Sequence, residues 1–346
     1  MLPDSVGARH TWGRNMLKDR KMELSIALNR YDRHIPFFNQ TIAPPDGFEL
    51  KAYEVGESLP FRDGADRHDR ILFGEEYDIG EMGLSGWIMA VSRNPDLPFV
   101  GLPIFPRRFF SFGQIYTNPN SGIEKPGDLT GKKIGLHAWQ TTLSVLAKGD
   151  LKIEYGFDWR QSEWVCMREE PIPVNFDDDM SVTVMPENKD IGVMLMEGEI
   201  DALMSPQPRR SMLAEPHKYR RLFPADGRAD ASYFHKYGYY PIMHLMVMRR
   251  ELAEKYPELP HQILKLFRDA YELAQSFYDD SNYSLLVWAR NALEQQKEAL
   301  GTNPWTDGLA ANKKNLDQFI NYSHDQRLIE TVFNCEKLFH ESVLDT

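Results

Sequence analysis

The fold is decided by the stretch YDIGEMGLSGW, residues 77–87. An apolar run containing Ile79 and Met82 leads into a turn with two glycines and a serine, and the WIMAV segment that follows is typical of the buried side of a helix. This pattern predicts a strand, a tight turn and a helix N-terminus. Such a junction directs backbone N–H groups toward the carboxyl edge of a sheet, where anions bind, so we expect Glu81 and Ser85 there. The alternative is a turn that needs its glycines only for geometry.

A second junction of this kind follows in GKKIGLHAWQTT, residues 131–142. The pattern predicts a strand that ends at His137 and a helix that opens over 138–142 and stops at Gly156. Thr141 or Thr142 is a natural N-cap, and their hydroxyls either cap the helix or face a ligand. The segment 198–206 predicts another strand that ends in small polar residues.

The remaining pattern predicts a mixed α/β chain. We expect strands at 23–28, 48–55, 97–105, 162–167 and 242–248, and helices at 64–73, 191–197, 260–279, 284–300 and 309–322. Two aromatic-rich crossovers, near 107–113 and 237–241, divide the chain. The predicted organisation is an N-terminal tail (1–21), a discontinuous first lobe with C-terminal helices (22–110 plus 240–346) and a second lobe (111–239). A ligand is then expected in a cleft between the lobes, where hinge closure excludes water.

Composition excludes some classes of partner. The 346 residues include 40 basic and 51 acidic ones, a formal charge of −11, without long runs of either sign, so nucleic acid and anionic membranes are not expected partners. The segment 1–21 lacks a secretory signal pattern, and no stretch approaches the roughly 18 apolar residues of a membrane span, so a cytoplasmic location is expected. Cys166 and Cys335 follow no metal spacing and are expected as free thiols. Trp288 and Trp305 in the helical C-terminus favour a homo-oligomer.

The layout resembles the type II periplasmic-binding-protein fold. Five strings extend the resemblance to the 4,5-dihydroxyphthalate decarboxylase family over most of residues 22–280: YDIGEMGLS (77–85), PIFPRRF (103–109), GKKIG (131–135), GEIDAL (198–203) and YPIMH (240–244). The resemblance implies non-oxidative loss of CO2 from a hydroxylated aromatic carboxylate, with conversion of 4,5-dihydroxyphthalate to protocatechuate as the expected reaction, without an organic cofactor. A solute-binding protein for an aromatic or sulfonated anion, or another cytoplasmic lyase on this fold, is the alternative.

That reaction needs a base near the phenol, an acid near the ring carbon and a cation for a second carboxylate. His244, within an apolar strand, is the first acid–base candidate, against the alternative of a core histidine. His137, at a strand end, is the second, or else a cap. Glu81 is expected either as the ring-protonating acid, if desolvation raises its pKa, or as a carboxylate paired with an arginine.

The expected substrate-binding residues are mainly cations and hydroxyls. Arg107 and Arg108 are neighbours in an extended segment and cannot both face one cleft, so one is expected to clamp a substrate carboxylate and the other to bridge the lobes or face solvent. The other expected contacts are Arg33, Tyr31, Ser85, Thr141 and Thr142. No metal is expected; a divalent ion held by His34, Glu81, His137 and His244 is the alternative.

Overall fold

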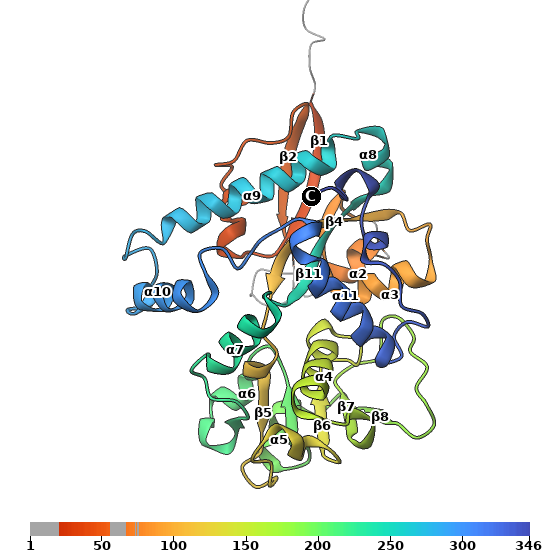
Figure 1. The fold of residues 1–346 in the computed structure, drawn as a ribbon, viewed down its shortest axis with the longest axis vertical. Coiled ribbons are helices and arrows are strands. Elements are labelled where there is room, and N and C mark those ends of the chain that lie inside the picture. The colour runs from red at the N-terminus through yellow and green to blue at the C-terminus, as the bar shows by residue number, and fades with distance from the viewer. Residues whose placement is uncertain (1–20, 56–66, 73, 75) are drawn as a thin grey trace, which may run out of the picture.

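The computed structural model describes residues 21–55, 67–72, 74 and 76–346, and two β-sheets stand one above the other in it (Figure 1). The predicted N-terminal tail lies outside the described residues except for Lys21, and so does part of the helix predicted at 64–73. The largest apolar core includes Leu245 of the first sheet and Ile134 of the second, so both sheets contribute to it. The predicted α/β class is confirmed.

The first sheet, at the top of Figure 1, has five strands in the order β2-β1-β3-β11-β4. β1 is parallel to β2 and β3, whereas β11 is antiparallel to both of its neighbours, β3 and β4. The strands are β1 (Met22–Leu28), β2 (Phe48–Glu54), β3 (Ile79–Gly83), β4 (Phe99–Arg108) and β11 (Ile242–Arg249). A strand from near residue 245 therefore lies between two strands from the first third of the chain.

Strand β4 is irregular at Pro103-Ile104-Phe105-Pro106. Met246 of β11 pairs with Leu102, but His244 pairs with Arg107, so four residues of β4 bulge out between these two pairs. A proline has no N–H to donate to a neighbouring strand, which is why prolines in sheets favour bulges. The strand resumes after the bulge and ends at Arg108, so the strand end predicted at 105 is wrong and both arginines belong to the strand.

The second sheet has six strands in the order β10-β5-β9-β6-β7-β8. β6, β7, β8 and β9 are mutually parallel, and β5 is antiparallel to both β9 and β10. Its strands are β5 (Ile115–Thr117), β6 (Lys133–Leu136), β7 (Glu163–Cys166), β8 (Ser181–Val184), β9 (Ala202–Met204) and β10 (Arg220–Arg221). The chain enters this sheet after β4 and returns to the first sheet at β11; the exact lobe boundaries stay a prediction.

Helices cover both sheets, and their ends follow local sequence chemistry. Gly156 (φ +66°) ends α4 and Gly198 (φ +78°) ends α5, both in the left-handed conformation that favours glycine. The helix predicted from 284 begins later, at Ala289, and α7 was not predicted. The helices are α1 (Ile35–Phe38), α2 (Arg67–Leu72), α3 (Leu84–Arg93), α4 (Thr142–Tyr155), α5 (Ile191–Glu197), α6 (Arg210–Leu213), α7 (Arg228–Tyr237), α8 (Arg250–Lys255), α9 (Leu259–Phe277), α10 (Ala289–Leu300) and α11 (Leu309–Asp325).

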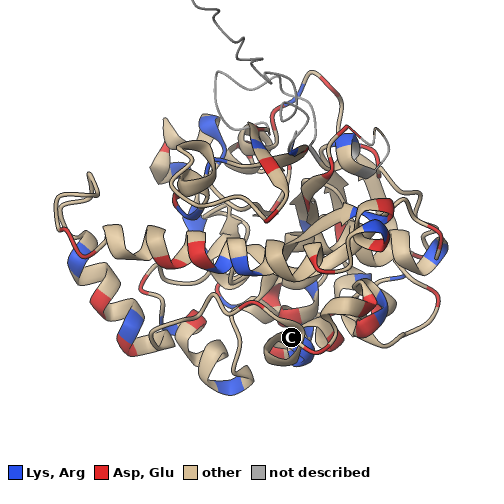
Figure 2. Ribbon diagram, turned by 90° about the horizontal axis from the view of Figure 1, so that it is seen from above, with Lys and Arg blue, Asp and Glu red and all other residues tan. Residues whose placement is uncertain are grey.

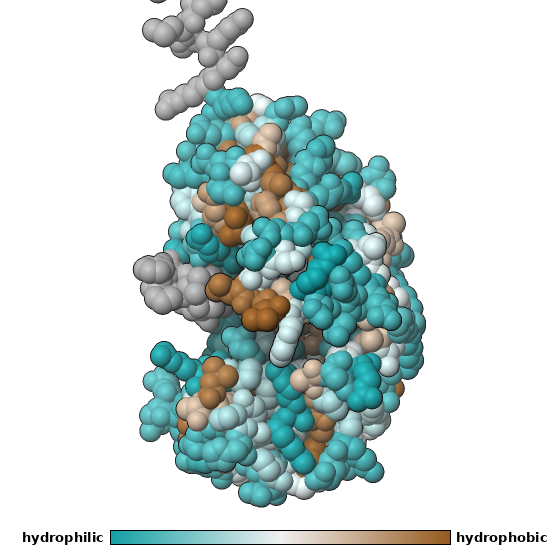
Figure 3. All heavy atoms as spheres, turned by 90° about the vertical axis from the view of Figure 1, so that its left-hand side faces the viewer, coloured by the Kyte–Doolittle hydropathy of each residue, from teal (hydrophilic) through white to brown (hydrophobic). Residues whose placement is uncertain are grey.

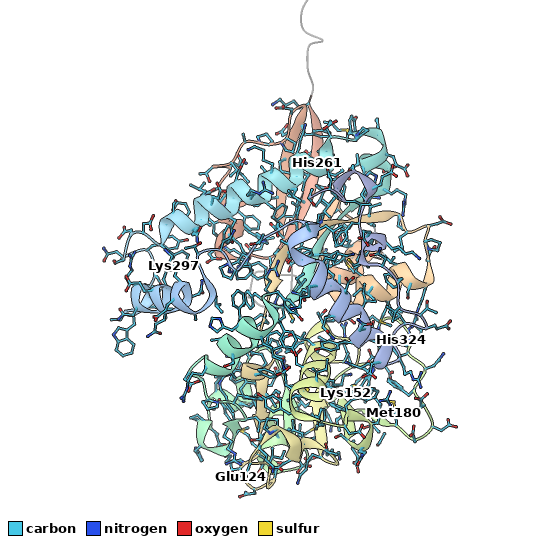
Figure 4. The ribbon with its side chains drawn as sticks, viewed as in Figure 1. Glu124, Lys152, Met180, His261, Lys297 and His324 are labelled. Atoms are coloured by element: carbon cyan, nitrogen blue, oxygen red, sulfur yellow. The ribbon has the colours of Figure 1, made fainter. Side chains whose placement is uncertain are left out.

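Helix α11 joins the two halves of the molecule. Near its start, Asn312 accepts a hydrogen bond from Arg108 of β4 at 2.8 Å. At its end, Asp325 pairs with Lys152 of α4 at 2.6 Å, and Figure 4 shows Lys152 near this end of the helix. The side chain of Gln326, directly after α11, donates to the carbonyl of Val145 at 2.8 Å. One helix is therefore anchored to the first sheet at one end and to the second-sheet side at the other.

The surface carries charges of both signs and an exposed apolar segment. Figure 2 shows basic and acidic residues interspersed along the helices and strands rather than gathered by sign. The apolar segment, Leu285–Trp288, precedes α10, and its side chains are 71% to 103% exposed. Figure 3, which faces the side of the molecule where α10 projects, shows an apolar group of atoms near mid-height. Within the described part of the chain, no helix has the length and apolarity needed to cross a membrane. The homo-oligomer stays a prediction.

Candidate active site

A buried carboxylate–imidazole pair, Glu81 and His244, lies at the centre of the first sheet. In the register of β3 and β11, Gly83 is opposite His244 and Glu81 is opposite Met246. Glu81 and His244 are therefore diagonal neighbours on one face of the sheet, within reach of each other. His244 Nδ1 and Glu81 Oε1 form a hydrogen bond, although 163 residues separate them. Glu81 is 0% and His244 is 7% exposed, so the pair is largely removed from water.

Tyr31 adds a second hydrogen bond to the same carboxylate oxygen. Its hydroxyl donates to Glu81 Oε1 at 3.3 Å and accepts from Asn29 Nδ2 at 3.0 Å. Asn29 and Tyr31 directly follow β1, which is parallel to β3, so both reach the carboxyl edge of the sheet. The predicted site residue Tyr31 thus contacts the predicted site residue Glu81.

His68 is a site neighbour that the sequence did not indicate. Its ring lies edge-on to the ring of His244, with centroids 4.9 Å apart and an interplanar angle of 85°. A Cβ at Gly83 would lie 3.4 Å from His68 Cε1, so the glycine leaves room for this imidazole. His68 comes from α2, a short charged segment (RHDRIL) without a recognisable pattern, so no sequence signal distinguished it.

The two junctions recognised in the sequence meet in space. Gly83 is the N-cap of α3, and Thr142 is the first residue of α4. The N–H of Ser85 donates to Thr142 Oγ1 at 3.3 Å, which joins the two helix N-termini. Thr141 occupies the predicted N-cap position of α4, but its hydroxyl makes no capping hydrogen bond. The hydroxyl of Ser85 is fully buried and makes no hydrogen bond with any other described residue.

The second junction already holds an anion from the chain itself. The carboxylate of Glu170 accepts from the N–H groups of Trp139 and Gln140, the latter at 3.0 Å. These amides, which precede α4, are therefore bonded to a protein carboxylate. His137 lies half-buried in the same turn, and its catalytic role stays a prediction.

The paired arginines have different surroundings. Arg108 is 3% exposed and donates to the carbonyls of Tyr240 and Thr306 at 2.7 Å and to Asn312 Oδ1 at 2.8 Å. Burial lowers the pKa of its guanidinium to about 10. Its donors thus join β4 to the second crossover and to the C-terminal region.

Arg107 is directly opposite His244 in the register of β4 and β11, and opposed residues on paired strands project from the same face. It is half-buried, and its guanidinium lies 5.2 Å from the ring of Phe109. Within the described part of the chain, its side chain makes neither a hydrogen bond nor an ion pair. Gly83, His244 and Arg107 therefore form a row across three strands, with the cation at one end.

Arg33 supports the β4 bulge. Its guanidinium lies between the rings of Tyr31 and Trp305, 4.1 and 4.4 Å from their centroids, and Nε donates to the carbonyl of Pro106 at 2.7 Å. These contacts hold the segment just before Arg107. The expected role of Arg33 as a second substrate cation stays a prediction.

The aromatic crossovers pack on each other. Phe110 and Tyr240 stack with centroids 4.7 Å apart, and the N–H of Phe109 donates to the carbonyl of Pro241 at 3.0 Å. These contacts pack the two crossovers against each other. Both cysteines are free and buried, as expected. Among the described residues, no group of three or more His, Cys, Asp or Glu is arranged to hold a metal ion.

Two α/β sheets linked by two crossovers define a two-lobed protein of the periplasmic-binding-protein type, and the buried carboxylate–imidazole pair lies within the first of these sheets. Solved structures with this fold include the periplasmic aliphatic sulphonate binding protein SsuA from Escherichia coli (TM-score 0.55, 14% identity, 94% of this chain and 99% of that one). A putative sulfonate-binding SsuA from Methylobacillus flagellatus is similar as well (TM-score 0.53, 13% identity, 94% of each chain). At such identities the likeness shows the fold alone.

Sequence relatives identify the family. The chain is 28% identical over 334 residues to the 4,5-dihydroxyphthalate decarboxylase of Comamonas testosteroni, covering 94% of this chain and 98% of the relative. It is 30% identical over 193 residues to the enzyme of the same name from Pseudomonas putida, covering 54% and 71%. No family model matches. The chain belongs to the 4,5-dihydroxyphthalate decarboxylase family, and the expected enzyme class, carboxy-lyase, is confirmed.

Proposed function

We propose that this protein converts 4,5-dihydroxyphthalate to protocatechuate and CO2, with the Glu81–His244 pair as its acid–base centre. The observation that carries the proposal is this buried hydrogen-bonded pair beside the cation Arg107, in a chain whose relatives are named for that activity. Pure binding of an anion needs donors and cations. A buried carboxylate bonded to an imidazole also permits proton transfer.

The reaction exchanges CO2 for a proton. A proton adds to the ring carbon that bears the leaving carboxylate, while the hydroxyl para to it gives up its own proton and its oxygen donates electron density into the ring. The bond from the ring carbon to the carboxylate then breaks, CO2 leaves, and that electron pair restores the aromatic ring. The phenolate finally regains a proton. No oxidant or reductant enters this balance.

His244 and Glu81 divide this work in the proposal. Glu81 accepts a hydrogen bond from Nδ1 of His244. This bond orients the imidazole and stabilises its protonated form, as a carboxylate does for a catalytic histidine. The other ring nitrogen, Nε2, is then the atom that delivers the proton to the ring carbon. The low exposure of both side chains strengthens their interaction, because water does not screen it.

Arg107 binds the carboxylate that remains on the ring. Its position opposite His244 supports this role, whereas both terminal nitrogens of Arg108 donate to protein oxygens. The Arg107→Met variant should raise KM about 10- to 100-fold, because a charge-assisted hydrogen bond contributes roughly 1.5–3 kcal/mol. Steady-state kinetics check this. Arg108→Met is the matched comparison: it should lower the unfolding temperature, since it removes three hydrogen bonds of a buried side chain, whereas Arg107→Met should not. Equal KM for Arg107→Met and wild type would contradict the clamp.

The proposed activity is tested by incubating the purified protein with 4,5-dihydroxyphthalate and following CO2 release together with the ultraviolet spectrum of the ring. We expect CO2 and protocatechuate in equal amounts. The reaction is run with and without a chelator, and loss of activity that Mg²⁺, Mn²⁺ or Zn²⁺ restores would show a metal requirement. Absence of CO2 release in both arms and after metal addition would overturn the proposal.

A solute-binding protein is the second candidate, favoured by the sulphonate-binding proteins among the fold neighbours. The same fold serves binding and catalysis, so the fold does not discriminate between them. Tight binding of 4,5-dihydroxyphthalate without CO2 release would support this candidate.

A further inference from the structure

A buried amide oxygen at the edge of the site, Asn29 Oδ1, has no hydrogen-bond partner among the described residues. Asn29 is 7% exposed, and its Oδ1 accepts no hydrogen bond from any residue that the structure describes. Buried side-chain oxygens are almost always hydrogen-bonded, and leaving one without a partner costs roughly 1–3 kcal/mol. A buried acceptor without a donor at the edge of a site indicates a ligand that donates a hydrogen bond to it.

The orientation of the Asn29 amide follows from its neighbours. Tyr31 has one hydroxyl hydrogen, which it donates to Glu81 Oε1. The Tyr31 oxygen must therefore accept from Asn29, so the amide presents its NH2 group to Tyr31. The Oδ1 atom consequently points away from Tyr31. The Asn29 amide is linked to the Glu81 carboxylate by two hydrogen bonds in series, through the Tyr31 hydroxyl. This arrangement places an acceptor beside the acid–base pair.

The chemistry of Oδ1 decides which part of a ligand it can bind. An amide oxygen accepts hydrogen bonds and cannot donate them. A carboxylate offers no hydrogen, whereas a phenolic hydroxyl does. Asn29 Oδ1 is thus suited to a ring hydroxyl, and Arg107 to the carboxylate. Ser85 Oγ, another buried atom with no hydrogen-bond partner in the described part of the chain, both donates and accepts and suits either end of the ligand.

We propose that Asn29 is a specificity-determining residue, whose Oδ1 accepts a hydrogen bond from a phenolic hydroxyl of the substrate. The inference rests on the proposed function and names the group that recognises the hydroxylated edge of the ring. A ligand without hydroxyls leaves Oδ1 unsatisfied and is disfavoured for that reason, as in other sites built to bind a substrate hydroxyl.

The test compares equilibrium binding of 4,5-dihydroxyphthalate and phthalate, which carries the same two carboxylates and no hydroxyl. Calorimetry gives the ratio of the two dissociation constants for wild type, Asn29→Leu and Tyr31→Phe. Tyr31→Phe is the matched variant because it also breaks the link between Asn29 and Glu81 but leaves the Asn29 oxygen in place. Thermal unfolding of each variant checks that the fold is retained.

We expect Asn29→Leu to reduce the preference for the hydroxylated ligand at least about tenfold, and Tyr31→Phe to leave that ratio within about twofold. An unchanged ratio in Asn29→Leu, or the same change in both variants, would overturn the inference. Because the readout is binding, it is independent of turnover: absence of CO2 release from wild type overturns the proposed function, and the binding ratio alone decides the role of Asn29.

Discussion

The His244→Ala variant should lower kcat about 1,000-fold with 4,5-dihydroxyphthalate, with a smaller change in KM. The proposed role of His244 is proton delivery in the transition state, and a positioned acid or base contributes typically about 100- to 10,000-fold. Single-turnover kinetics measure this step directly. Added imidazole should restore part of the rate, because it can occupy the vacated space and carry the proton. A merely structural role for His244 would not produce this rescue.

Two further variants separate chemistry from folding. Removing His244 leaves the buried Glu81 without the imidazole, which destabilises the fold. His244→Gln offers an amide N–H to Glu81 and should fold better, yet it should be as inactive as His244→Ala. His217→Ala is the matched control: the His217 side chain is 76% exposed, and its loss should leave kcat unchanged. Wild-type kcat in His244→Gln would overturn the assignment.

The Asp150→Asn variant should change how stability depends on pH. Asp150 of α4 is 1% exposed and accepts hydrogen bonds from Ser111 Oγ at 2.6 Å, Tyr322 at 3.0 Å and Tyr233 at 3.1 Å. Burial, the largest cause, and the nearby Glu154 raise the pKa of this carboxyl, the three hydroxyls partly offset them, and the net pKa is about 7. These donors come from the first crossover, α11 and α7, so the carboxyl lies where the two crossovers and the C-terminal helix meet.

The direction of the pH effect follows from proton binding. Between the unfolded pKa near 4 and the folded pKa near 7, the native state holds a proton on Asp150 that the unfolded state has released. The contribution of this group to the free energy of unfolding is therefore fully present below about pH 4 and is lost as the pH rises to 7, at about 1.4 kcal/mol per unit. From pH 5 to pH 8 wild type should lose roughly 3 kcal/mol relative to Asp150→Asn.

Urea unfolding of both proteins at pH 5 and pH 8 measures this difference. Asp128→Asn is the matched control, because backbone N–H groups of Glu124 and Lys125 lower the pKa of Asp128 and remove its titration from this range. Its stability difference from wild type should be the same at both pH values. A difference between wild type and Asp150→Asn that does not change from pH 5 to pH 8 would contradict the assignment.

Local elements of the fold were predictable because their signals lie within a few residues. The strand, turn and helix at 77–93 follow from a short apolar run, two glycines and an amphipathic segment. Helix α5 matches its predicted range, since Asp190 caps its first turn and Gly198 adopts the left-handed conformation at its end. The end of β4 was predicted too early because two prolines indicated a break, and the structure accommodates them in a bulge.

The site could be predicted only as a set of candidates. Glu81, Ser85 and Tyr31 were expected at strand ends, and His244 was expected from its place in an apolar strand. His68 and Glu170 were not singled out as functional residues, because each has its role only through a distant partner.

The sequence by itself determined the α/β class, most of the strands and helices, and the family, because local patterns and characteristic strings carry that information. Only the tertiary structure decided which candidates meet. Antiparallel insertion of β11 between β3 and β4 places His244 beside Glu81 and opposite Arg107, and the β4 bulge sets that register. Burial of Arg108 and of the Asp150 network likewise depends on α11, more than 150 residues farther along the chain. Such contacts are set by strand register and helix packing between distant segments, and no pattern within a few residues encodes them.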